Sequence, residues 1–113
     1  MTSGMTGSAE HFDLVIIGSG SGNHIPEDLN DRRIAVIERD VFGGTCLNRG
    51  CIPSKMFVLP ADRIVEAAEA DRLGVEIPAG RADWAAIRDR IFGRIDPISA
   101  SGRDYRAERC ENG

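Results

Sequence analysis

The sequence predicts an α/β fold that begins with a parallel strand–glycine turn–helix–strand unit. A short apolar run over Phe12–Ile17, a glycine-rich turn over Gly18–Asn23 and a second apolar run over Ile34–Ile37 carry this prediction. Short β-branched runs that stop at a turn or a charge indicate buried strands. Two parallel strands need a crossover, usually a helix, so a short helix is expected from about Asn23 to Arg32. Pro26 is tolerable there only near the first turn.

Length and charge limit the classes of protein that fit the sequence. The chain has 113 residues and a net charge of −4, which suits one small domain without a broad basic face for nucleic acid. No apolar run approaches the roughly 20 residues of a membrane span. Residues 1–11 are small and polar and lack a signal core, so we expect a disordered tail and a cytoplasmic protein. We expect residues 12–113 to fold.

A loop over residues 41–55 should lead into a helix that continues over Met56–Arg72. Pro60 removes a backbone donor and should kink or interrupt that helix. Gly74 is a plausible helix stop, because glycine readily adopts the left-handed conformation that ends helices.

Asp83 is a good N-cap for a last helix. Apolar residues then recur at steps of three and four, which predicts one buried stripe: Trp84, Ile87, Ile91, Ile95 and Ile98. Pro97 should kink or restart this helix. The charged residues between Asp83 and Arg94 are expected to form its solvated face.

The glycine turn has the features of a phosphate-binding loop. A helix N-terminus offers free N–H groups, and side chains at Gly18 and Gly20 would obstruct the close approach of a pyrophosphate. Asn23 occupies the third position of the usual fingerprint, with Gly22 one place earlier. Glu38 follows Gly18 by twenty positions and ends the second strand, where a carboxylate can accept hydrogen bonds from ribose. These residues indicate an adenine dinucleotide site and leave FAD and NAD as alternatives.

Two of the three cysteines, Cys46 and Cys51, stand five positions apart. A regular helix would place their Cα atoms roughly 8–9 Å apart, whereas a disulfide needs less than about 7 Å. The helix should therefore be irregular between Leu47 and Gly50. A redox pair, a structural disulfide and half of a zinc site are the alternatives, and the spacing disfavours zinc, so no metal is expected. Cys110 lies far from any motif and is expected to be an incidental thiol.

The stretch Gly43–Lys55, GGTCLNRGCIPSK, resembles the active-site motif of the pyridine nucleotide–disulfide oxidoreductases. Within that family, GSGSGN in the turn, FGRIDPI over Phe92–Ile98 and Asp104–Arg106 are most similar to the mycothione reductase group. The resemblance implies an incomplete, Rossmann-like FAD-binding domain over residues 12–113. It implies FAD as cofactor, a small-molecule disulfide as substrate, and NADPH and homodimer contacts supplied by domains that these residues do not contain.

The resemblance also assigns roles to residues. Cys46 would be the thiol that attacks the substrate disulfide, and Cys51 the thiol beside the flavin. Thr45 would lie near the isoalloxazine and Lys55 near its reactive nitrogen. Glu38 would bind the ribose. The remaining expected cofactor contacts are Gly18, Ser19, Gly20, Ser21, Gly22, Asn23, Gly43 and Gly44.

The sequence leaves three other interpretations open. The chain could be part of a dihydrolipoamide dehydrogenase-like or glutathione reductase-like enzyme, which share the cysteine motif. It could be an NAD-dependent dehydrogenase that uses only the glycine turn, although such an enzyme does not need GGTCLNRGC. It could also be an inactive truncated polypeptide, because two parallel strands with unpaired edges do not make a stable sheet.

Overall fold

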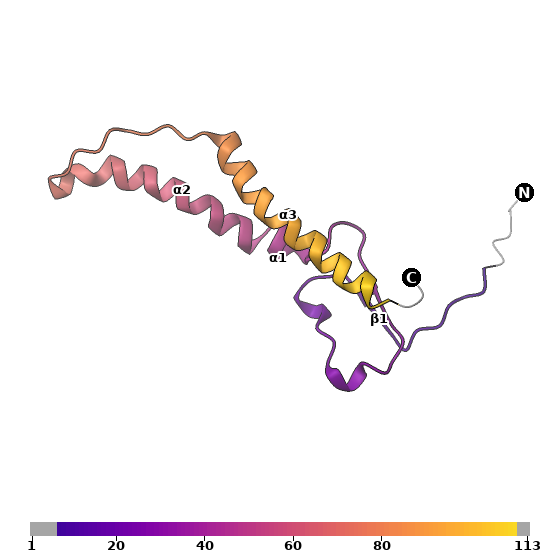
Figure 1. Cartoon of the computed structure of the whole chain (residues 1–113). Coiled ribbons are helices and arrows are strands. Elements are labelled where there is room, and N and C mark those ends of the chain that lie inside the picture. The colour runs from indigo at the N-terminus through magenta and orange to yellow at the C-terminus, as the bar shows by residue number, and fades with distance from the viewer. Residues whose placement is uncertain (1–6, 111–113) are drawn as a thin grey trace, which may run out of the picture.

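A computed structural model describes residues 7–110 of the chain. Within this part, two short strands come first and three α-helices follow (Figure 1). Short 3₁₀ turns lie between the two strands and between the last two α-helices. Residues 7–12 have no regular secondary structure. Residues 1–6 of the predicted tail lie outside the described residues, so disorder of the tail stays a prediction.

The two strands pair in parallel, as expected. β1 (Leu14–Ile17) lies beside β2 (Ile34–Ile37), in a register that places Ile17 opposite Ile37. Burial of these strands was also expected, and this is wrong: the Ile17 side chain is 86% exposed and Ile37 is exposed as well. The helices pack mainly on one another and not over the sheet, so the strands' apolar side chains have little cover.

The connection between the strands differs from the prediction. No α-helix spans residues 23–32; instead there are two single 3₁₀ turns, η1 (Ser21–Asn23) and η2 (Glu27–Leu29). Between them His24 has ψ 116° and Pro26 has ψ 148°, both extended. A residue before proline is disfavoured from helical backbone, so Pro26 stops helix from growing through its neighbours instead of opening one.

The cysteine segment forms two helices with a break between them. α1 (Gly44–Asn48) ends before α2 (Cys51–Glu69) begins. At the junction Arg49 has φ −142°, and Gly50 has φ −128° with ψ −118°, neither of them helical. The predicted irregularity between Leu47 and Gly50 is confirmed. Gly50 is required there, because a Cβ would lie 2.9 Å from the Thr45 carbonyl oxygen.

α2 begins earlier than expected and continues through Pro60. Pro60 lies inside it without ending it. A 3₁₀ turn, η3 (Ala70–Leu73), follows directly, and Gly74 ends the segment with φ 77° and an N–H that donates to the carbonyls of Ala70 and Asp71. The predicted stop at Gly74 is confirmed, and its mechanism is a left-handed cap.

α3 (Trp84–Glu108) begins at the predicted cap: the Asp83 carboxylate accepts a hydrogen bond from the Ala86 N–H at 3.0 Å. Pro97 lies inside α3 and does not divide it.

The predicted apolar stripe on α3 is partly wrong. Ile91 and Ile95 are 0% and 1% exposed and form the centre of the core. Ile98 is half exposed, and the buried face continues instead through Ser99, whose hydroxyl donates to the Phe42 carbonyl at 2.5 Å. Four-residue steps from Ile91 follow the 3.6-residue helical period closely enough to stay on one face. A small residue there lets α3 approach the Phe42 backbone.

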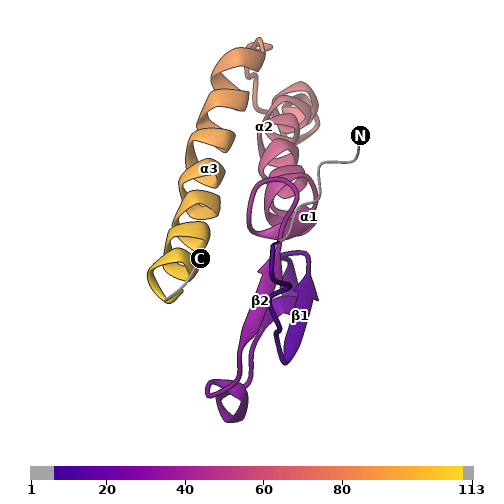
Figure 2. The ribbon, with the colours of Figure 1, turned by 90° about the vertical axis from the view of Figure 1, so that its right-hand side faces the viewer.

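The two long helices form an elongated pair. α2 and α3 lie side by side, and α1 sits between them and the sheet (Figure 2). The Phe57 ring of α2 stacks on Trp84 of α3 with centroids 5.1 Å apart, although Trp84 is otherwise largely exposed. The radius of gyration is 22.2 Å, against about 13 Å for a compact domain of this length. The described residues are therefore a mixed α/β arrangement compatible with part of a Rossmann-like domain.

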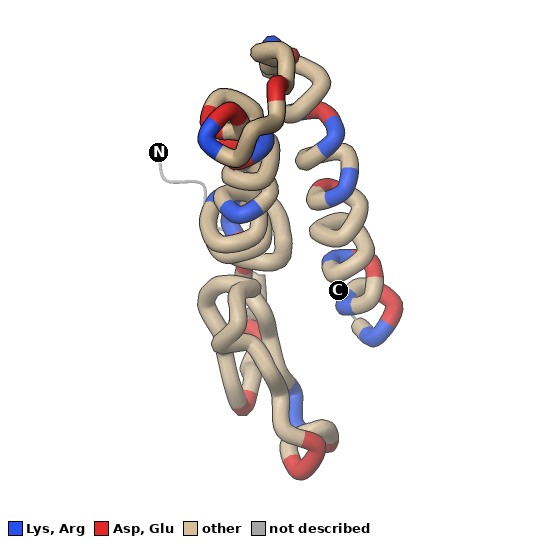
Figure 3. Tube along the Cα trace, turned by 90° about the vertical axis from the view of Figure 1, so that its left-hand side faces the viewer, with Lys and Arg blue, Asp and Glu red and all other residues tan. Residues whose placement is uncertain are grey.

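Basic and acidic residues are mixed on α2 and α3 (Figure 3). Most of the ion pairs are between neighbours on the surface, such as Arg63 with Glu66, and such pairs add little stability. Within residues 7–110, no helix combines the length and the apolar character needed to cross a membrane.

Candidate functional site

The glycine turn and the cysteine segment touch through their backbones. Gly44, at the start of α1, has φ 75°, and a Cβ there would lie 2.5 Å from the Cα of Gly20. Real Cβ atoms do not approach so closely, so only glycine fits this contact. The sequence placed both segments in one site by resemblance alone; the contact of Gly20 with Gly44 supplies the physical link.

A cavity of about 330 Å³ lies where the two segments meet. Six of the predicted site residues line it: Gly18, Ser19, Gly20, Glu38, Gly44 and Thr45. Arg39, Asp40, Val41, Asn48 and Arg49 complete the wall. Gly18 ends β1 with φ 97° and has open space where a side chain would be. This volume is at the lower end of small-molecule sites, and it suits part of a dinucleotide better than a whole one.

Glu38 presents its carboxylate at this cavity. One oxygen accepts hydrogen bonds from the Ser19 N–H at 3.0 Å and from the Ser19 hydroxyl at 2.5 Å. The other accepts from the Asp40 N–H at 3.1 Å. These donors favour the charged form, so the pKa of Glu38 is lowered, first by the Ser19 hydroxyl and then by the backbone N–H of Asp40. The carboxylate is therefore ionised at neutral pH and held in one orientation.

The loop that carries the cysteine motif is held by Asn48. Its buried side-chain amide donates to the carbonyl oxygens of Phe42 at 2.9 Å and Gly44 at 3.0 Å. Sequence reasoning did not select Asn48. Its position inside the motif was the available signal, since asparagine readily bonds to nearby backbone.

Neither Cys46 nor Cys51 lines this cavity, although Thr45, Asn48 and Arg49, close to them in the sequence, do. Cys46 is in α1 and Cys51 is the first residue of α2; both are exposed and have free thiols. The pKa of Cys46 is raised, chiefly by a hydrogen bond with the Cys51 thiol, and further by slight desolvation and by the charge of Cys51. The thiols are thus neighbours despite the broken helix.

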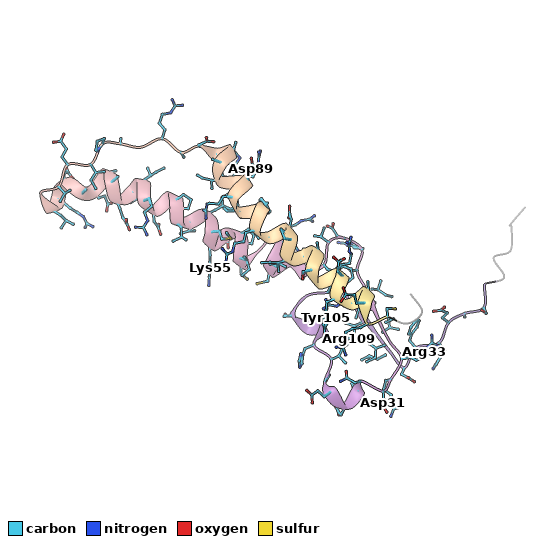
Figure 4. The ribbon with its side chains drawn as sticks, in the orientation of Figure 1. Asp31, Arg33, Lys55, Asp89, Tyr105 and Arg109 are labelled. Carbon is cyan, nitrogen blue, oxygen red and sulfur yellow. The ribbon has the colours of Figure 1, made fainter. Side chains whose placement is uncertain are left out.

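Lys55 is four residues after Cys51, on the same face of α2, and projects from the N-terminal part of that helix (Figure 4). It lines neither this cavity nor the larger one described next. The structure therefore places it beside the dithiol and not beside the glycine turn.

The rest of the glycine turn faces elsewhere. Ser21 and Asn23 line a second cavity of about 550 Å³, and Gly22 faces open space. Tyr105 and Arg109, at the end of α3, form the far wall of this cavity (Figure 4). The Asn23 side-chain nitrogen is buried without a hydrogen-bond partner among the described residues. The turn predicted as a single binding loop thus has two sides.

Cys110 also lines the larger cavity, and its thiol is exposed. Among residues 7–110, no group of three or more His, Cys, Asp or Glu side chains is arranged to hold a metal ion.

Known proteins resemble the chain over most of its length. Mycothione reductase of Mycobacterium tuberculosis is 49% identical over 102 residues, which are 89% of this chain and 22% of that protein. Dihydrolipoyl dehydrogenases of Bacillus subtilis and Chlamydia muridarum are 34% and 38% identical over 95 and 98 residues. These matches span 81% and 84% of this chain and 20% of each relative. The resemblance to the pyridine nucleotide–disulfide oxidoreductases is confirmed.

The chain spans about a fifth of the length of the curated relatives that it matches. No family model matches it. Its likeness is therefore to one stretch of a family of oxidoreductase enzymes, the stretch that carries the glycine turn and the cysteine motif.

Proposed function

We propose that this chain is the N-terminal, FAD-binding and redox-dithiol part of an NADPH-dependent reductase of a low-molecular-weight disulfide, with mycothione as the substrate. The observation that carries the proposal is the junction of Gly20 with Gly44. It joins a dinucleotide-type turn to a cysteine pair and leaves a cavity with an ionised carboxylate, Glu38, on its wall. The 49% identity to a mycothione reductase supports the choice of substrate.

The residues around the cavity fit the adenosine and pyrophosphate part of FAD. Gly18 and Gly20 allow close approach of phosphate to backbone, and Glu38 offers carboxylate oxygens to ribose hydroxyls. Thr45, next to Cys46 in the sequence, also lines the cavity, and by resemblance it would lie near the isoalloxazine. Bound FAD would carry two electrons between a nicotinamide and the dithiol.

In the proposed reaction the Cys46 thiolate attacks one sulfur of the substrate disulfide. A mixed disulfide forms, and the other substrate sulfur leaves as a thiol after taking a proton. Cys51 then attacks the Cys46 sulfur, releases the second thiol and leaves the Cys46–Cys51 disulfide. Two electrons, relayed from NADPH by bound FAD, would be needed to reduce this disulfide to the dithiol again.

Proton transfer is the step that Cys46 and Cys51 leave to other groups. The neighbouring Cys51 raises the pKa of Cys46, so the Cys46 thiol is protonated at neutral pH. A base must therefore take the Cys46 proton, or a nearby cation must stabilise the thiolate. By resemblance, we propose that the complete enzyme is a cytoplasmic homodimer in which a His–Glu pair of the other subunit handles this proton. Lys55, one helical turn from Cys51, is the nearest cation along α2.

A dihydrolipoyl dehydrogenase-type activity is the second candidate, favoured by the relatives that are 34% and 38% identical. The glutathione reductase-like alternative rests on the cysteine motif alone. Assays with mycothione, lipoamide and glutathione disulfide on the complete enzyme would separate the three.

The cofactor proposal is tested by titrating the chain with FAD and following flavin fluorescence. We expect weak binding, because the sheet is largely uncovered. E38A should weaken it by roughly 1–3 kcal/mol, the value of charge-assisted hydrogen bonds to ribose. E76A, which removes an exposed carboxylate from the irregular segment after Gly74, is the matched control. Equal FAD affinity of E38A and E76A would contradict the role of Glu38. A melting temperature unaffected by FAD would favour an inactive polypeptide.

Catalysis is tested separately. Residues 1–113 contain one glycine fingerprint of the dinucleotide type and no histidine in a stretch like the family's His–Glu motif. We therefore expect no sustained oxidation of NADPH when the chain is mixed with FAD and a disulfide. Sustained, Cys46-dependent consumption would show that these residues hold a second nucleotide site.

A further inference from the structure

We propose that Ser19 is a positioning residue whose hydroxyl fixes Glu38 and the cysteine loop relative to each other. The inference deepens the proposed function and rests on it for its meaning: one hydroxyl would set the spacing between the ribose-binding carboxylate and the segment that leads to the dithiol. The glycine fingerprint leaves the residue between its first two glycines unspecified, so the turn motif alone gives Ser19 no side-chain role.

The hydrogen bonds of Ser19 use its hydroxyl in both directions. The hydroxyl donates to Glu38 at 2.5 Å and accepts from the Gly43 N–H at 3.0 Å, while the Ser19 N–H donates to the same Glu38 oxygen at 3.0 Å. A hydroxyl has one proton to donate and lone pairs to accept, so both contacts form at once. We call this set of three residues the Ser19 clasp.

Burial makes the clasp hard to replace. Ser19 is 4% exposed, and it is one of the few buried polar residues among those described. Glu38 and Gly43, the two groups that the hydroxyl joins, are half-buried. An alanine at this position would remove the hydrogen bonds at both ends of the clasp and leave each group without this partner.

Among residues 7–110, no cation forms an ion pair with Glu38 that would compete with its hydrogen bonds to Ser19. The charged groups that share the cavity wall are Arg39, Asp40 and Arg49. Arg49 pairs with Asp40 at 2.7 Å, and no ion pair of Glu38 occurs within the described residues. The orientation of the carboxylate therefore depends on the hydrogen bonds of Ser19 and on the Asp40 N–H.

The first arm of the test needs no ligand. NMR gives the pKa of the Glu38 carboxyl and the exchange rate of the Gly43 amide in the 113-residue chain. S19A should raise that pKa toward the ordinary glutamate value and speed Gly43 exchange about fivefold, the factor that corresponds to one ordinary hydrogen bond. S19T, which keeps the hydroxyl, should restore both. S101A, at an exposed site on α3, is the control.

Unchanged Glu38 titration and Gly43 exchange in S19A would overturn the proposal. If S19A does not fold, the parent chain decides alone. Its Glu38 must titrate below a glutamate in an unstructured peptide, and its Gly43 amide must exchange more slowly than that of Gly80 in the irregular segment. Failure of either comparison refutes the clasp.

The second arm ties the clasp to the proposed cofactor. FAD and FMN share the flavin, but only FAD has the adenosine ribose that Glu38 would bind. S19A should reduce the preference for FAD over FMN about fivefold, whereas a general loss of structure would weaken both. If neither flavin binds the parent chain, the proposed function fails while the first arm still decides the clasp. Binding with an unchanged preference means that Ser19 does not position Glu38 for ribose.

Discussion

Replacing Gly44 by alanine should open the junction between the sheet and the helices. Gly44 has φ 75°, a backbone conformation that costs a residue with a Cβ about 1–2 kcal/mol. The new Cβ would also lie 2.5 Å from the Cα of Gly20. Carbon atoms pack at about 3.5–4.0 Å, so one backbone must move by roughly 1 Å.

Such overpacking costs typically about 1–3 kcal/mol, because the obstacle is backbone and cannot rotate away. Together the two effects amount to about 2–5 kcal/mol. That is comparable with the whole stability of a marginal small domain. Few side chains are fully buried in the described residues, and the two largest, Ile91 and Ile95, belong to α3. The junction should therefore separate before the α2–α3 pair does.

The experiment compares G44A with G22A in urea, using two signals. Trp84 fluorescence reports the helix pair through its stacking on Phe57, and backbone NMR signals of β1 and β2 report the sheet. G22A is the matched control, because Gly22 is in the glycine turn that Gly44 contacts, lacks a positive φ and has nothing within 4 Å of the point that a Cβ would occupy. G44A should lose the sheet signals at lower urea than G22A and keep the Trp84 signal. Equal stability of the two variants would refute the backbone contact.

Four further predictions follow from single contacts. C51A should lower the pKa of Cys46 and speed its alkylation near pH 8, as measured by mass spectrometry, since Cys51 is the main cause of the raised value; an unchanged pH profile would contradict this. I91A should lower the free energy of unfolding in urea by about 2–5 kcal/mol, and I98A by much less, because Ile91 is fully buried and Ile98 is half exposed. Equal losses for the two variants would support the predicted stripe. Because the pKa of Glu38 is lowered, its ionised form stabilises the fold, and this stabilisation is fully present above the ordinary glutamate pKa and lost as pH falls. The urea midpoints of the parent chain and E38Q should therefore converge in acid, and a constant difference would argue against this role. D83A should cost about 1 kcal/mol of α3 stability by circular dichroism, unlike D71A, which removes a carboxylate that caps no α-helix.

The elements that the sequence predicted well are those fixed by local chemistry. Ile34–Ile37 is a strand with the expected bounds, because a β-branched run leaves little alternative. Asp83 caps α3 and Gly74 ends the segment before it, each through a bond that its own backbone neighbours supply. The break near Gly50 was predicted from the Cα–Cα distance that a disulfide between Cys46 and Cys51 would allow. None of these features needs knowledge of what packs around them.

The predictions that failed depended on packing partners. Strand burial was inferred from composition, but within the described residues no helix layer covers β1 and β2, so Ile17 is exposed. The helical period allowed either Ile98 or Ser99 on the buried face, and the Phe42 carbonyl selects Ser99. The prediction of a helix over residues 23–32 gave too little weight to Pro26, which disfavours helical backbone in the residue just before it.

Two segments far apart in the sequence owe their joint site to backbone contacts that no motif records. The glycine turn and the cysteine loop are each familiar patterns, and their residues were predicted separately. In the structure a Cβ-free contact between Gly20 and Gly44 brings them together, and the Ser19 hydroxyl bonds to both Glu38 and Gly43. The first is steric and the second polar, so they contribute differently: the missing Cβ of Gly44 lets the loop approach the turn closely, and the Ser19 hydroxyl adds hydrogen bonds that tie the loop to Glu38. A cofactor that spanned turn and loop would need both contacts, because it would have to touch residues on both sides of this junction.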